Sequence, residues 1–126
     1  MAHAEFLRQE GGDDLAVEQV KSDWREMELT PGEHAMLEYV EKLTLTPSAM
    51  TEEDVQKLRD VGWTDRDILD IVQVCAYFNF RVRVVDGLGL EVANWQIQRA
   101  RAGAERAQKL AAERGVTMPR DLWAVR

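Results

Sequence analysis

The sequence predicts an all-α protein, a bundle of about five to six helices in a single domain over residues 1–126. Two observations favour this fold class. Helix-start signals recur along the chain, each followed by a glycine or proline where the helix would end. In addition, the long apolar run over residues 64–86 contains no glycine or proline. A chain of 126 residues has the length of one domain and can bury a substantial core.

The N-terminal part predicts two short helical segments. Residues 2–10 form a short amphipathic piece, which Gly11 and Gly12 end. Asp13 or Asp14 can then cap a helix that runs toward Trp24, because a carboxylate before an apolar-periodic stretch accepts a hydrogen bond from the first turn.

The stretch Thr30-Pro31-Gly32-Glu33 is a strong start signal for the next helix. It sets a hydroxyl at the N-cap, a proline at the first helical position and a glutamate three residues after the cap. Pro47 ends this helix. Its apolar residues have the spacing of one buried stripe: Met36, Leu37, Tyr39, Val40 and Leu43.

Thr51 and Asp54 repeat this capping pattern and start a shorter helix. Val55 and Leu58 are its expected buried residues, with Val61 at its edge. Gly62 supplies the left-handed residue that ends it.

Thr64 with Asp67 opens a helix near residues 65–86, and Gly87-Leu88-Gly89 ends it. The run is too long for a strand, so its β-branched residues are assigned to a helix. Because it is apolar on more than one face, we expect it to be the central helix, covered by neighbours on most sides.

The composition of residues 91–114 predicts an alanine-rich helix that ends at Gly115. We expect a tail over residues 115–126. The apolar stripe of this helix is thin and made of small residues, which permits close helix–helix approach. Such a stripe buries little by itself, so we expect this helix to lie at a contact between subunits.

Charge excludes several classes of partner. The chain carries 16 basic and 23 acidic side chains, a net charge of −7, which argues against a nucleic-acid surface. The longest unbroken apolar stretch, residues 74–78, is far too short to span a membrane, and the charged first ten residues do not form a signal peptide. We therefore expect a cytoplasmic protein with no membrane partner.

The charge is also unevenly distributed. Residues 1–70 hold 7 basic and 18 acidic groups, whereas residues 71–126 hold 9 basic and 5 acidic groups. Two interpretations are open. The basic C-terminal segment lies against the acidic N-terminal segment, in the same or a neighbouring subunit, or both are solvated helical faces of different composition.

Few residues carry reactive chemistry, and we expect no cofactor and no metal. His3 and His34 are far apart and lack flanking carboxylate motifs, and His34 is expected to be a solvated surface residue. Cys75 is the only thiol, so an internal disulfide is excluded. Its apolar neighbours on the helix favour a packing role. The alternative is a one-cysteine peroxidatic thiol, activated by an arginine such as Arg83, which would require solvent access.

Several motifs resemble peroxidase-related proteins of the alkylhydroperoxidase D / carboxymuconolactone decarboxylase superfamily. Tyr77-Phe78-Asn79-Phe80, then Arg83 and Asp86-Gly87-Leu88-Gly89, resemble the end of a helix in that group. Residues 41–47 and 68–74 are similar to it as well. Residues 3–8 are similar to the end of its CxxCxxxHxxxLR signature, and the resemblance covers most of residues 3–90.

The resemblance implies an alkylhydroperoxidase-D-like helical fold that assembles into dimers, trimers or hexamers. It also implies a site in which two cysteines reduce peroxides, a histidine and a glutamate relay protons, and a small thiol-reducing partner restores the cysteines. In this alignment His3 is the motif histidine, and the second cysteine falls four residues earlier, before Met1. The domain is thus expected to be N-terminally incomplete relative to the family.

Three functions remain open at this point. The first is a thiol peroxidase whose CxxC segment lies outside these residues. The second is a non-catalytic helical oligomer that keeps the scaffold without the site. The third is proton-transfer or decarboxylase-type chemistry on a small acid, with His3 as the base and a carboxylate such as Glu5 or Glu33 beside it.

Overall fold

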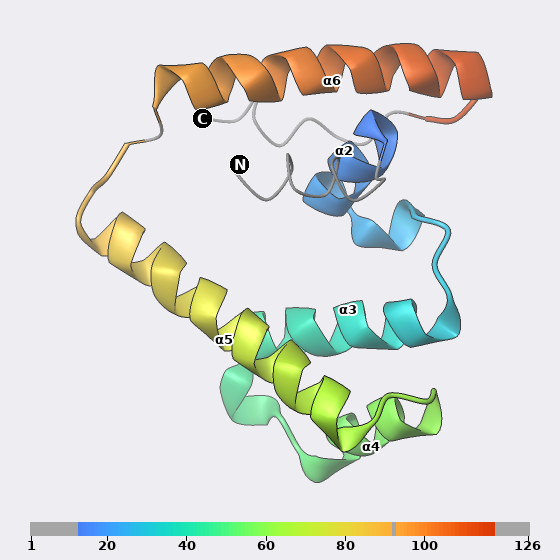
Figure 1. Ribbon diagram of the computed structural model, residues 1–126, viewed down its shortest axis with the longest axis vertical. Coiled ribbons are helices and arrows are strands. Elements are labelled where there is room, and N and C mark those ends of the chain that lie inside the picture. The colour runs from blue at the N-terminus through green and yellow to red at the C-terminus, as the bar shows by residue number, and fades with distance from the viewer. Residues whose placement is uncertain (1–12, 92, 118–126) are drawn as a thin grey trace. The chain divides into compact units, whose positions relative to one another are not determined.

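The computed structural model describes residues 13–91 and 93–117, and all regular secondary structure in those ranges is helical (Figure 1). The predicted all-α fold class is therefore confirmed. The described elements are α2 (Asp14–Ser22), the 3₁₀ turn η1 (Trp24–Glu26), α3 (Pro31–Leu45), the 3₁₀ turn η2 (Pro47–Ala49), α4 (Glu52–Asp60), α5 (Asp65–Gly87) and α6 (Asn94–Arg114).

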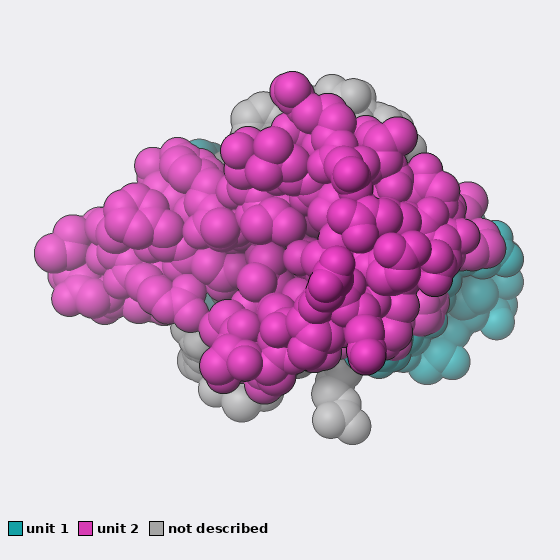
Figure 2. Space-filling view, turned by 90° about the horizontal axis from the view of Figure 1, so that it is seen from below, with its two compact units in different colours: residues 1–28, 91–126 teal, residues 29–90 magenta. Residues whose placement is uncertain are grey.

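The chain forms two compact units, coloured separately in Figure 2. Unit 1 comprises residues 1–28 and 91–126, and unit 2 comprises residues 29–90. The single-domain organisation stays a prediction. Among the residues the structure describes, no helix is both long and apolar enough to cross a membrane.

The helices of unit 2 begin where the capping residues predict. Glu33 Oε2 accepts a hydrogen bond from Thr30 N at 2.8 Å, and Asp67 Oδ2 accepts one from Thr64 N at 2.9 Å. Thr51 N donates to Asp54 Oδ2 at 2.8 Å in the same way. Each bond satisfies a backbone donor that a helix start would otherwise leave unpaired, and all three predicted helix starts are confirmed.

Unit 2 has a small core at the meeting of three helices. Tyr39 of α3, Leu58 of α4 and Ile68 of α5 are buried against one another, and Leu58 is 0% exposed. The apolar stripe expected on α3 is only partly buried. Tyr39 is the buried residue of that helix, and the other residues of the stripe are half-buried. Partly buried apolar side chains surround the core: Ala35, Leu43, Met50, Val55, Trp63, Ile71 and Val72.

A turn and a hydrogen bond fix the start of α5 against α3. Gly62 has φ +102°, which a residue with a Cβ rarely adopts, so the predicted glycine stop is confirmed. Trp63 Nε1 donates to the carbonyl oxygen of Gly32 at 2.9 Å. This bond ties Trp63, two residues before α5, to the first turn of α3.

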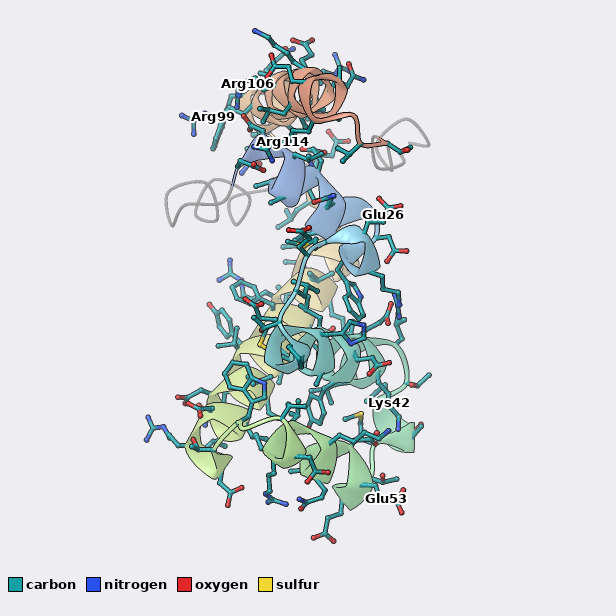
Figure 3. All side chains as sticks on the ribbon, turned by 90° about the vertical axis from the view of Figure 1, so that its right-hand side faces the viewer. Glu26, Lys42, Glu53, Arg99, Arg106 and Arg114 are labelled. Carbon is teal, nitrogen blue, oxygen red and sulfur yellow. The ribbon has the colours of Figure 1, made fainter. Side chains whose placement is uncertain are left out.

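A buried carboxylate joins α3 to α4. Lys42 Nζ of α3 lies 2.6 Å from Asp54 Oδ2 of α4, and Asp54 is buried (Lys42 is labelled in Figure 3). The hydrogen bond from Lys42, and after it the hydrogen bond from Thr51 N, lower the pKa of Asp54 below its ordinary value. Asp54 thus serves both as a capping residue and as the anchor of an interhelical ion pair.

The expectation that α5 is covered on most sides is wrong. Only Ile68 and Cys75 are buried among its residues, and its C-terminal half is exposed throughout apart from the half-buried Asn79. The physical reason is that α5 has few neighbouring helices in unit 2. The helices α3 and α4 contact it, and together they cover one of its faces. Large apolar side chains therefore remain on its other face.

Unit 1 pairs segments from the two ends of the sequence. Leu15 and Val17 of α2 are buried, and so is a small-residue stripe on α6, the helix that α2 contacts. That stripe consists of Gly103, Ala107 and Ala111. The predicted alanine-rich helix is confirmed, although α6 starts three residues later than expected, and its small face contacts α2 of the same chain.

Two ion pairs accompany the α2–α6 contact. Arg106 Nε lies 2.7 Å from Asp14 Oδ2, and Arg114 Nη1 lies 2.6 Å from Asp13 Oδ2. Of the two interpretations of the uneven charge, the contact of basic C-terminal with acidic N-terminal residues is confirmed, within one chain. Both arginines are about half exposed, so the pairs contribute little stability individually and mainly fix the register of the two helices.

Leu58→Ala should lower the free energy of unfolding by about 2–5 kcal/mol, because it removes a fully buried side chain and leaves a cavity. Leu45→Ala is the matched control, since Leu45 is 71% exposed, and it should change stability by less than about 0.5 kcal/mol. Urea denaturation followed by circular dichroism measures both. Equal effects would contradict the placement of the core.

Acid should destabilise the protein through Asp54. Its pKa is lower in the folded than in the unfolded chain, so the ionised form stabilises the fold above the ordinary value of 3.8, and that stability is lost as the pH falls through the folded pKa. The Asp54→Asn variant should therefore have a lower free energy of unfolding than the wild-type chain at pH 7. The difference between the two free energies should become smaller below about pH 4. Urea denaturation from pH 7 to pH 2.5 measures this difference, with the exposed Asp65→Asn as control. A difference in free energy of unfolding that does not change with pH would contradict the stabilising role of the ionised Asp54 carboxylate.

Candidate functional site

The described residue with the most reactive side chain, Cys75, lies in the contact between α3 and α5. It is 7% exposed. Its Sγ is 3.3 Å from Asn79 Nδ2, 3.5 Å from Thr44 Oγ1 and 3.9 Å from the carbonyl oxygen of Val40. Cys75 and Asn79 share one face of α5 because they are one helical turn apart, and Val40 and Thr44 have the same spacing on α3.

Asn79 organises this cluster. Its Nδ2 donates to Thr44 Oγ1 at 3.0 Å, across the helix pair, and to the carbonyl oxygen of Cys75 at 3.0 Å. Arg83 Nη1 in turn donates to the carbonyl oxygen of Asn79 at 2.9 Å and approaches its Oδ1 at 3.4 Å. The result is a short polar chain that runs from α3 along α5 within a mainly apolar contact.

The surroundings of the sulfur are those of a packed thiol. A reactive cysteine is stabilised as the thiolate by a nearby cation, a base or a helix N-terminus. The recorded contacts of Sγ are a hydroxyl, an amide and a carbonyl, all uncharged. Arg83, the arginine suggested from the sequence, hydrogen-bonds to Asn79 and reaches the thiol only through that residue. Burial and these contacts support the packing role.

Of the other sequence-predicted site residues, the structure describes Glu33 and His34, and neither is among the recorded contacts of Cys75. His3 and Glu5 lie outside the described residues, so the proton-relay role of His3 stays a prediction. Glu33 is occupied in the capping box of α3, where hydrogen bonds from Thr30, first from its backbone N–H and then from its hydroxyl, lower its pKa. His34 is exposed in the first turn of α3, as expected. Within residues 13–91 and 93–117, no three potential metal ligands gather into a group that could hold an ion.

Sequence reasoning missed the pairing of Thr44 with Asn79. Both residues belong to segments noted for their resemblance to known proteins, but they are 35 positions apart, and no local pattern indicates that the two side chains meet. The available indication was a hydroxyl and an amide placed on otherwise apolar helical faces, because buried polar groups must find a partner.

No family model matches the sequence, and no curated protein matches it either. Among solved structures, the fold is similar to that of an uncharacterized peroxidase-related protein from Silicibacter sp. TM1040, with a TM-score of 0.69 and 31% sequence identity. The similarity covers 74% of this chain and 49% of that one, so the chain spans about half the length of the protein it matches. The chain is therefore similar, in fold and in sequence, to a peroxidase-related helical protein.

Proposed function

We propose that this chain is part of a peroxidase-related protein, and that its 126 residues supply a self-associating helical scaffold that cannot reduce peroxide with its own cysteine. Thiol-dependent peroxide reduction then belongs to a complete form of the protein that carries the CxxC segment. The observation that carries this proposal is the state of Cys75, which is the only thiol in the sequence and is buried among uncharged groups.

The redox balance explains why a second thiol matters. A hydroperoxide takes two electrons to become an alcohol and water. A thiolate supplies them by attacking the terminal oxygen, which breaks the O–O bond and leaves a sulfenic acid on the sulfur. A second thiol then displaces water from that sulfenic acid and forms a disulfide. One cysteine in a chain can make the sulfenic acid but cannot close an internal disulfide.

Self-association is the second part of the proposal. Most of the large exposed apolar residues of unit 2 lie on α5, and on its outer face Val74 is 57% exposed and Tyr77 is 53% exposed. Contiguous apolar patches of more than a few hundred Å² are rare on monomers and mark contact surfaces. The resemblance to oligomeric proteins is consistent with such a use of this helix.

The purified chain should not catalyse peroxide reduction through Cys75. Consumption of an organic hydroperoxide with dithiothreitol as reductant should be equal for the wild-type chain and for Cys75→Ser, and equal to the protein-free rate, because the sulfur is buried and its contacts with the described residues are uncharged. Turnover by the wild-type chain that Cys75→Ser abolishes would overturn the scaffold proposal. Reading the gene upstream of Met1 tests the other part, since an in-frame CxxC ending four residues before His3 is expected.

Cys75 should react slowly with Ellman's reagent in the folded chain and at least about tenfold faster in denaturant, because a buried thiol is shielded from the reagent. The matched control moves the thiol by one position. The double variant Cys75→Ser, Ala76→Cys places it on the exposed side of α5 and should react rapidly without denaturant. Equally fast labelling of native Cys75 would contradict its packing role.

A further inference from the structure

We propose that two copies of the chain pair in antiparallel orientation along the outer face of α5. The face consists of Asp70, Val74, Tyr77, Arg81, Val84 and Leu88, here named the α5 seam. This inference rests on the self-association proposed above and deepens it, because it names the contact surface, the partner and the register.

The seam has the spacing of a coiled-coil contact. Its six residues are separated by steps of four, three, four, three and four, the repeat by which a and d positions stay on one side of a helix. All six are exposed, with Val74 57%, Tyr77 53% and Leu88 69% exposed. The residues of α5 that face α3, among them Ile68, Cys75 and Asn79, lie on the opposite side of the helix.

The charges of the seam select a second copy in antiparallel orientation. Asp70 lies four residues before Val74, and Arg81 lies four residues after Tyr77, so these four residues are symmetric about the midpoint between Val74 and Tyr77. Val84 and the C-cap residue Leu88 lie beyond this symmetric part of the seam. A two-fold axis at that midpoint sets Asp70 opposite Arg81 of the second copy, and Val74 opposite its Tyr77. A parallel pairing would instead oppose Asp70 to Asp70 and Arg81 to Arg81.

Present contacts leave both charged groups accessible to a partner. Asp70 Oδ2 lies 3.3 Å from Arg66 Nε, and Arg81 Nη1 lies 3.4 Å from Tyr77 Oη, and each pair is one helical turn apart on an exposed surface. Such exposed pairs contribute little and rearrange readily. A two-fold contact repeats every interaction, so each new ion pair and each Val74–Tyr77 contact is formed twice.

The alanine-rich helix, the contact expected from the sequence, is a weaker candidate for this surface. Its buried stripe already contacts α2 of the same chain. Within the part of the chain that the structure describes, the α5 seam is exposed and carries larger apolar side chains.

Sedimentation velocity of the full chain at several concentrations tests the pairing. The wild-type chain should form a dimer or an assembly of dimers. Asp70→Arg and Arg81→Asp should each weaken association by about tenfold or more, because each replaces two attractive pairs with two like-charge contacts. The double variant Asp70→Arg, Arg81→Asp should restore association to near the wild-type value. Glu53→Arg, an exposed charge reversal on α4, is the matched control and should leave association unchanged (Figure 3).

The outcomes separate this inference from the proposal on which it rests. Three results would overturn the α5 pairing while self-association stands. The first is association that is equally strong in the wild-type chain and in every variant, and the second is a double variant whose association is not restored. The third is a trimer, which a two-fold contact cannot close. A wild-type chain that remains a 14.4 kDa monomer at micromolar concentration would overturn self-association itself. Circular dichroism of each variant verifies that the helices are retained.

Discussion

The contact between α3 and α5 is the interaction on which unit 2 depends. Tyr39 and Ile68 pack there against the fully buried Leu58 of α4, and farther along the same contact Thr44, Cys75 and Asn79 join the two helices through polar groups. An apolar contact alone leaves two helices free to slide, because dispersion and burial have little directional preference. The amide of Asn79 has donors at fixed angles, so it sets the register in which the apolar residues meet.

That contact also sets the surroundings of Cys75. The sulfur of Cys75 lies in the middle of the helix pair, and Arg83, one helical turn after Asn79, donates a hydrogen bond to the carbonyl oxygen of Asn79. A thiol in this position fills space beside a hydroxyl and an amide. The buried setting of Cys75 and the similarity to about half of a peroxidase-related protein are the two observations on which the proposed scaffold role rests.

Local features were predictable from the sequence, and long-range ones were not. Thr30, Thr51 and Thr64 identify helix starts because each forms its hydrogen bonds with a residue three positions away. The pairing of Lys42 with Asp54, or of Thr44 with Asn79, depends on how two helices cross, which no short window of sequence contains. The coverage of α5 was mispredicted for a related reason. The apolar composition of α5 indicates that several of its faces will be buried. It does not indicate whether the same chain, another copy or another segment covers them.

The pairing of α2 with α6 has a consequence for how the chain acquires its structure. Unit 2 is continuous in sequence, whereas Asp14 and Arg106 are separated by 92 positions. During synthesis the residues of unit 2 leave the ribosome before α6 exists, so unit 2 can fold while Leu15 and Val17 still lack the helix that covers them. Until α6 has been synthesised, α2 therefore lacks the helix against which its apolar residues pack.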